Sequence, residues 1–114
     1  MALVYKICPR HLWESAERSG VFAGAPVDLR DGYIHLSTAA QLGETAARHF
    51  RGESDLLLVA LDEARLGDGL RYEPSRGGAL FPHFYGALPL EAVAWVEPML
   101  PGADGSPIVP GIEP

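Results

Sequence analysis

Cysteine and lysine are almost missing from this sequence, which contains one of each among its 114 residues. The lone cysteine, Cys8, excludes an internal disulfide framework and suits a small core position, so we expect a cytoplasmic protein. No apolar run reaches the ~18 residues that indicate a membrane-spanning helix, so no membrane partner is expected. The formal net charge of −6 repels phosphate backbones, which disfavours broad nucleic-acid binding.

Motifs that would define a catalytic chemistry are absent as well. The 4 histidines form no HExxH pair, and with a single cysteine in the chain they form no His/Cys set typical of a metal site, so we predict no metal site. The 13 glycines include no GxGxxG or P-loop pattern, and no GxSxG nucleophile elbow occurs. Motifs alone therefore leave open whether the chain is an enzyme.

The hydrophobic pattern predicts two helices early in the chain and mostly strands after them. Thr38 and Gln41 match a capping box, and residues 55–62 form an apolar run typical of a central strand buried on both faces. This order predicts a single α+β domain over residues 1–100. The predicted helices are 9–20 and 38–50, and the predicted strands are 3–7, 33–37, 55–62, 70–74, part of 80–90, and 91–99.

Glycine and proline predict the connections between these elements. Residues 21–32 are expected to form a loop and residues 63–69 a turn. Pro82 has no amide proton to donate and so forbids a fully paired centre, which predicts that part of its segment lies at a sheet edge or a bulge. Residues 101–114 are rich in proline and glycine without periodicity, which predicts a mobile tail.

Two of the predicted strands each carry a histidine two residues from a tyrosine. Because side chains alternate along a strand, Tyr33, His35 and Ser37 share one face, and His83 and Tyr85 share another. If these faces meet, they form a wall that can stack on a planar ring and hydrogen-bond a sugar or a carboxylate. The alternative is that both histidines are hydrogen-bonded parts of the scaffold.

Arg71 and Glu73 share one face of the strand 70–74, with Tyr72 on the other face. Such a pair can line a pocket or lie in solvent, and the sequence leaves both readings open. Eight arginines against one lysine suit bidentate recognition of phosphate or carboxylate, although a GC-rich genome produces the same bias.

The segments GYIHLSTAAQ, DLLLVALD, RYEP and FPHFYGALPLEAVAWV together resemble the bacterial and plant family called domain of unknown function 952. The resemblance covers about residues 3–99, with the motifs in the expected order. It implies an ADP-ribosyltransferase-like fold, with the two early helices packed on short mixed or antiparallel sheets. Enzymes of that fold bind NAD in a cleft between two small sheets, but the family itself has no established activity.

The segment HLSTAAQLGETAARHF and the apolar strand after it also resemble the RNA 2′-phosphotransferases, which share the ADP-ribosyltransferase fold. Residues 35–37 match the HLS of these enzymes, and Arg48 and His49 match their Arg-His pair. Phe50 replaces a glycine of the pattern, and the first strand, VYKI, lacks a further Arg-His pair. The resemblance thus implies a scaffold with altered catalytic equipment.

Two classes of function follow from these patterns. The first is a binding module for a small anionic or nucleotide-like ligand in a cleft lined by histidine and tyrosine. The second is an NAD-dependent ADP-ribosyl- or 2′-phosphotransferase-type enzyme, with NAD as cofactor and Arg71 or Glu73 as catalytic candidates. The candidate ligand-binding residues are Tyr33, His35, Ser37, Arg48, Arg71, His83 and Tyr85.

Overall fold

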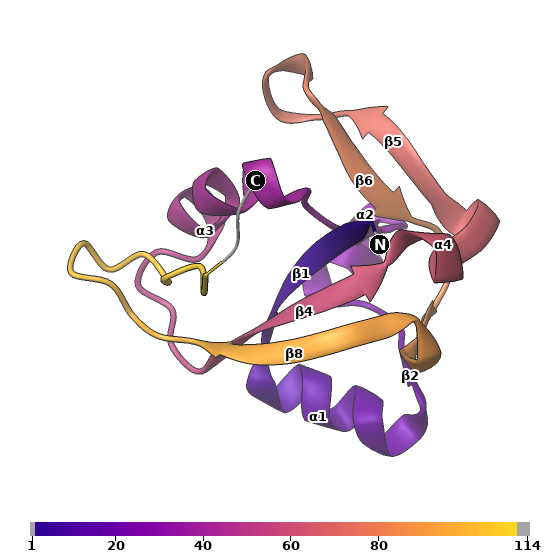
Figure 1. The fold of residues 1–114 in the computed structure, drawn as a ribbon, viewed down its shortest axis with the longest axis horizontal. Helices are drawn as coiled ribbons and strands as arrows, with labels where there is room; N and C mark the ends of the chain where they lie inside the picture. The colour runs from indigo at the N-terminus through magenta and orange to yellow at the C-terminus, as the bar shows by residue number, and fades with distance from the viewer. Residues whose placement is uncertain (1, 112–114) are drawn as a thin grey trace.

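The computed structural model, which describes residues 2–111 apart from the side chain of Arg76, arranges the strands of that range in three small antiparallel sheets (Figure 1). The predicted α+β class with small sheets is confirmed. The elements are β1 (Leu3–Pro9), α1 (Arg10–Ser19), β2 (Val21–Phe22), α2 (Pro26–Asp31), β3 (Ile34–His35), α3 (Leu42–His49), β4 (Leu56–Asp62), α4 (Glu63–Leu66), β5 (Leu70–Pro74), β6 (Leu80–Phe84), β7 (Leu88–Pro89) and β8 (Val93–Met99).

The first sheet has the order β1-β4-β8 and forms the centre of the molecule. Its middle strand β4 is buried from Leu56 to Leu61, as its continuous apolar run predicted. Alternate β4 side chains face opposite cores. Leu57 and its same-face neighbours join the core that includes Trp13 of α1, and Leu56 and its neighbours join the core that includes Leu42 of α3.

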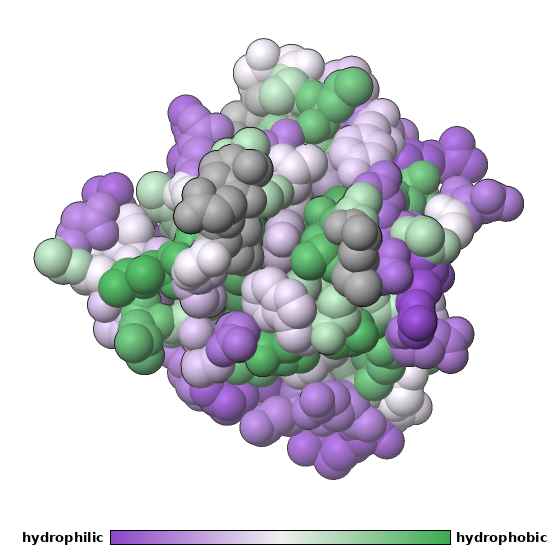
Figure 2. All heavy atoms as spheres, in the orientation of Figure 1, coloured by the Kyte–Doolittle hydropathy of each residue, from purple (hydrophilic) through white to green (hydrophobic). Residues whose placement is uncertain are grey.

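Both predicted early helices are confirmed, and they cover opposite faces of this sheet (Figure 1). Helix α1 buries Trp13 and Ala16 and turns hydrophilic side chains outward. These side chains form the purple lower edge of the molecule in Figure 2. Before α3, the Thr38 amide donates to Gln41 Oε1 at 3.0 Å, so the capping box forms as the sequence indicated. None of the helices described between residues 2 and 111 is long and apolar enough to cross a membrane.

Strand β3 joins the first sheet to a second, whose order is β3-β6-β5. Ile34 and His35 pair with β6, and the Leu36 amide then donates to the Pro82 carbonyl at 3.0 Å. One residue later, Ser37 pairs with Tyr5 on the outer edge of β1 through bonds of 2.8 and 2.9 Å. The short segment 34–37 therefore holds two sheets together by main-chain hydrogen bonds.

Strand β6 is the middle strand of its sheet, but Leu80–Pro82 pair with β5 and not with β3, so this part of the segment lies at an edge, as Pro82 predicted. Proline is tolerated there because the pairing with β3 ends at this point, where residues 36–37 leave β6 for β1.

The expected turn over residues 63–69 is wrong for its first four residues, which form the helix α4. The first turn of this helix is capped by Asp62, which accepts a hydrogen bond of 3.0 Å from the Ala64 amide.

The prediction of a loop over residues 21–32 is wrong too, since this segment contains β2 and the helix α2. Pro26 occupies the start of α2, and Asp28 accepts a hydrogen bond of 2.8 Å from the Ala25 amide. Gly32 ends the helix with φ of 87°, a conformation that glycine adopts without steric cost. This helix matters most for the site below.

The last described residues, 101–111, lie against the fold beside α3 (Figure 1). The Gly52 amide donates to the Gly105 carbonyl at 2.8 Å, Pro107 is buried, and Val109 packs on the core beneath α3. The segment thus has more core contacts than its composition predicts. Its mobility stays a prediction, and the last three residues of the predicted tail lie outside the described residues.

Candidate functional site

A buried carboxylate, Asp28, joins α2 to β1 and β3. Lys6 Nζ lies 3.1 Å from Asp28 Oδ1 and 3.0 Å from Oδ2, and both side chains are buried. The His35 amide donates to the same carboxylate at 3.0 Å. Burial opposes ionisation of Asp28, but hydrogen bonds from His35 and the charge of Lys6 outweigh it and lower the pKa of Asp28 to about 2. Asp28 is therefore a buried anion that accepts hydrogen bonds from Lys6, Ala25 and His35.

His35 has a carboxylate at each of its ring nitrogens. Nδ1 lies 2.7 Å from Asp28 Oδ1, and Nε2 lies 3.0 Å from Asp31 Oδ2. Lys6 Nζ also donates to the His35 carbonyl at 3.1 Å. Main chain and ring are thus held from three directions, which fixes the orientation of this imidazole on the wall of the site.

Tyr33 lies at the centre of a group of four rings. Its ring stacks on His83 with centroids 4.1 Å apart and an angle of 28° between the planes. Its centroid is 4.6 Å from that of His35 and 5.5 Å from that of Tyr85. His35 and His83 are cross-strand partners of β3 and β6, which explains why the two His/Tyr segments meet.

A second carboxylate, Glu73 of β5, holds the other histidine. Glu73 Oε1 lies 2.9 Å from His83 Nδ1 and accepts a bond of 2.7 Å from the Tyr85 hydroxyl. The hydrogen bonds from Tyr85 and His83 lower the pKa of Glu73, and the bond to Glu73 raises the pKa of Tyr85. The guanidinium carbon of Arg71 lies 5.8 Å from the centre of the Tyr85 ring.

A cleft of ≈ 710 Å³ opens beside these rings, between α2, α3 and the two sheets that β3 joins. Ser37 lies on its wall and hydrogen-bonds Thr45 of α3 at 3.0 Å. Its polar lining residues are Tyr5, Lys6, Arg30, Asp31, Tyr33, His35, Ser37, Thr45, His49, Glu53, Ser75 and His83, and its apolar ones are Ile7, Val27, Leu36, Phe50 and Phe81. No group of three or more His, Cys, Asp or Glu side chains in the described part of the chain could hold a metal ion.

Most of the residues singled out from the sequence are neighbours in the structure. Tyr33, His35, Ser37 and His83 line the cleft, and Tyr85 joins them through Tyr33 and Glu73. Arg71 lies next to Tyr85, outside the lining. Whether any of these residues binds a ligand stays a prediction.

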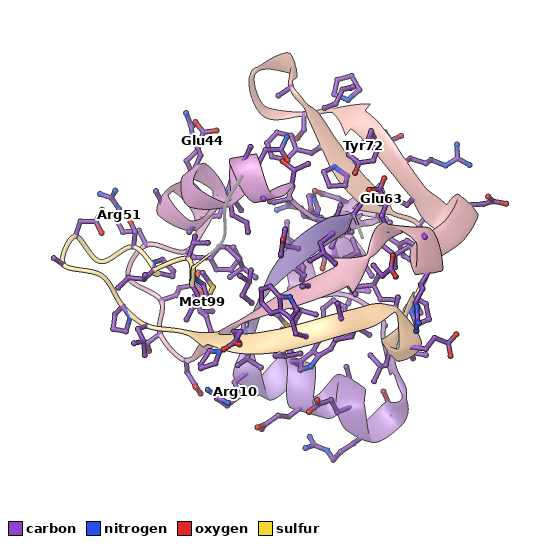
Figure 3. The ribbon with its side chains drawn as sticks, in the orientation of Figure 1. Arg10, Glu44, Arg51, Glu63, Tyr72 and Met99 are labelled. Atoms are coloured by element: carbon purple, nitrogen blue, oxygen red, sulfur yellow. The ribbon has the colours of Figure 1, made fainter. Side chains whose placement is uncertain are left out.

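Arg48 is the exception among the candidate residues. It lies on an exposed side of α3, where its Nε is 3.5 Å from Glu44 Oε2, and it does not line the cleft. Figure 3 shows Glu44 pointing away from the body of the molecule. The geometry thus gives Arg48 no contact with the group around Tyr33.

Residues 7–96 match the family described as "Protein of unknown function (DUF952)". The chain belongs to the DUF952 family. Solved structures of the protein CC0527 from Caulobacter crescentus share the fold: one crystal structure is 46% identical, with a TM-score of 0.90 and coverage of 93% of each chain. The solution NMR structure is 47% identical, with a TM-score of 0.84 and coverage of 94% of this chain and 92% of that one. No curated protein is significantly similar to this DUF952 chain.

The sequence analysis missed several polar residues of this DUF952 site, among them Lys6, Asp28, Arg30 and Asp31. The lone lysine lies within an apolar strand, where burying an unpaired charge costs free energy. A lysine in such a strand therefore indicates a buried acidic partner, and this was the available signal. Asp28 follows Pro26 by two positions, which is the pattern of a helix start. Since the segment was read as a loop, neither aspartate was considered.

Proposed function

We propose that the cleft binds a small anionic or nucleotide-like ligand, on a scaffold of the ADP-ribosyltransferase-like type. The observation that carries the proposal is the wall of imidazole and phenol rings, drawn from β3 and β6, inside a cleft of ≈ 710 Å³. Ligand sites for small molecules commonly occupy about 300–1,000 Å³ and combine apolar walls with a few fixed polar groups.

The ring of Tyr33 supplies a surface for stacking. It is half-buried and rests on His83, so it is supported from one side while part of it remains accessible. Phe50 and Phe81 add apolar lining to the same cleft. A planar ring such as a nucleobase gains both area burial and favourable ring geometry on such a surface.

Arg30 is the part of the lining that suits an anionic group in the ligand. The lining contains two cations, Lys6 and Arg30, and three imidazoles, against the carboxylates of Asp31 and Glu53. Lys6 is neutralised by Asp28, whereas Arg30 is exposed and, within the described residues, forms an ion pair with its neighbour Asp31 alone, at 2.9 Å. Arginine suits phosphate and carboxylate because its planar fork donates two parallel hydrogen bonds.

A second candidate is an enzyme that uses NAD, and one observation favours it. Glu73 and His83 form a carboxylate–imidazole pair at the wall of the cleft, which is a group able to hold a ribose hydroxyl. An assay that measures the release of nicotinamide from NAD by chromatography distinguishes this enzyme from a binding module. Turnover supports the enzyme, whereas binding of NAD without turnover supports the module.

The test is a melting-temperature screen with NAD, ADP-ribose, AMP and pyrophosphate, because a ligand that binds only the native state raises the melting temperature. We expect at least one nucleotide to raise it, and Tyr33→Leu to weaken that binding roughly tenfold, or ~1.4 kcal/mol, by loss of stacking. Tyr72→Leu is the matched control, since Tyr72 is an exposed tyrosine near Glu63 and outside the cleft lining (Figure 3). No shift with any of the four compounds, or equal losses in both variants, would contradict the proposal.

A further inference from the structure

The two histidines of the wall differ in what their ring nitrogens contact. His35 has both ring nitrogens on carboxylates, whereas the hydrogen bond of the His83 ring joins Nδ1 to Glu73. Within the described residues, His83 Nε2 has no hydrogen-bond partner. In that part of the chain, Trp13 Nε1 is the one side-chain nitrogen or oxygen that is both buried and without a hydrogen-bond partner. Because His83 Nε2 also has no partner but is not such a buried atom, it keeps contact with solvent, although the residue as a whole is only 3% exposed.

The direction of that opening follows from the surroundings of the ring. Tyr33 covers a face of the His83 ring with its centroid 4.1 Å away, and Glu73 occupies the Nδ1 edge. His83 lines the cleft, so the remaining Nε2 edge is the polar part of the ring that the cleft can reach. A ligand in the cleft would meet this nitrogen.

Glu73 decides whether that nitrogen donates or accepts. The bonds from Tyr85 and His83 lower the pKa of Glu73, so the carboxylate is ionised at neutral pH and can only accept. Nδ1 of His83 must then carry the proton in their 2.9 Å hydrogen bond. In a neutral imidazole with Nδ1 protonated, Nε2 is an acceptor.

We propose that His83 presents Nε2 to the cleft as a hydrogen-bond acceptor, and that the ligand brings a hydroxyl or N–H donor to it. Glu73 is the positioning residue that fixes this tautomer. The ligand's anionic group then belongs on the side of Arg30, since a phosphate oxygen opposite a neutral Nε2 would place two acceptors together. The statement about the ligand rests on the proposed function, but the tautomer of His83 does not.

The experiment records long-range ¹⁵N–¹H correlation spectra of the imidazole rings at several pH values, and the ¹⁵N shifts themselves show which rings are neutral. His83 is expected to show a protonated Nδ1 and an unprotonated Nε2, the opposite of the tautomer that unconstrained histidine side chains favour in water. Glu73→Ala should return His83 to that ordinary tautomer. Glu97→Ala, which removes an exposed carboxylate of the other sheet, should leave the spectrum unchanged. A purely structural role for Glu73 would not move the ring protons.

ADP-ribose, which carries hydroxyl donors and phosphates, is then added to the labelled protein. We expect the His83 Nε2 signal to shift in the wild-type protein. If Nε2 carries the proton in the free protein, the acceptor assignment is wrong, whatever binds. If the tautomer is as expected but ADP-ribose, NAD and AMP all leave Nε2 unmoved, the ligand class of the proposed function is wrong and the acceptor assignment holds.

Discussion

Replacing Asp28 with alanine should be among the most damaging single changes to this fold. Its carboxylate accepts hydrogen bonds from Lys6, from the amide and ring of His35, and from the Ala25 amide. Asp28→Ala removes all of these acceptors at once and leaves the buried ammonium of Lys6 without a counter-charge. Helix α2 would also lose its attachment to β1 and β3.

The magnitude follows from the burial of the pair. Breaking a buried ion pair by removing one partner costs about 3–5 kcal/mol, because the remaining charge is uncompensated. For a domain of this size, each kcal/mol lowers the melting temperature by roughly 4 °C, so we expect a loss of about 12–20 °C. Calorimetry or circular dichroism measures this loss, and chemical denaturation gives the free energy of unfolding.

Two further variants make the reasoning refutable. Asp68→Ala removes an exposed aspartate and should change the free energy of unfolding by less than ~0.5 kcal/mol. Combining Asp28→Ala with Lys6→Met removes the stranded charge, so the double variant should lose at least ~1 kcal/mol less than the sum of the two single losses. A cost below ~1 kcal/mol for Asp28→Ala, or simple additivity in the double variant, would show that the ion pair does not stabilise the fold.

Two other predictions concern acid and the C-terminal segment. The folded-state pKa of Asp28 is about 2 against an ordinary 3.8, so its stabilisation of about 2 kcal/mol is present above pH 4 and is lost as the pH falls from about 4 to about 2. Acid unfolding should show this loss of stability, and the loss between pH 4 and pH 2 should be absent in Asp28→Asn. Deleting residues 101–114 should lower the free energy of unfolding by about 1–3 kcal/mol, because Pro107 and Val109 leave their core contacts. An unchanged melting temperature after this truncation would instead support the mobile tail that the composition predicts.

The parts of the fold that the sequence predicted are those with a local cause. The apolar run of β4 and the capping box at Thr38 each act within a few residues, and both are confirmed. Helix α2 also had local signals, in Pro26 and Gly32, but six residues give no hydrophobic periodicity to weigh against a loop.

The candidate site was predictable only as far as strand geometry reaches. Alternation placed His35 with Tyr33 and His83 with Tyr85, and the register of β3 with β6 then brought the two pairs together. The partners of these rings were not predictable in the same way. Asp28 meets Lys6 across 22 residues of sequence, a contact set by how α2 packs on the first sheet. Arg48, taken from a sequence resemblance alone, faces solvent.

The double pairing of residues 34–37 has a consequence for how such a protein can diversify. Because Ile34, Leu36 and Ser37 bind β6 and β1 through their main chains, the separation of the two sheets does not depend on which side chains point into the space between them. Residues on the cleft wall that take no part in the buried Lys6–Asp28 ion pair can therefore be exchanged one at a time while the frame around them keeps its dimensions. Relatives with this frame can acquire different ligands by changing only the lining, and a designer can use the same freedom to build a new specificity.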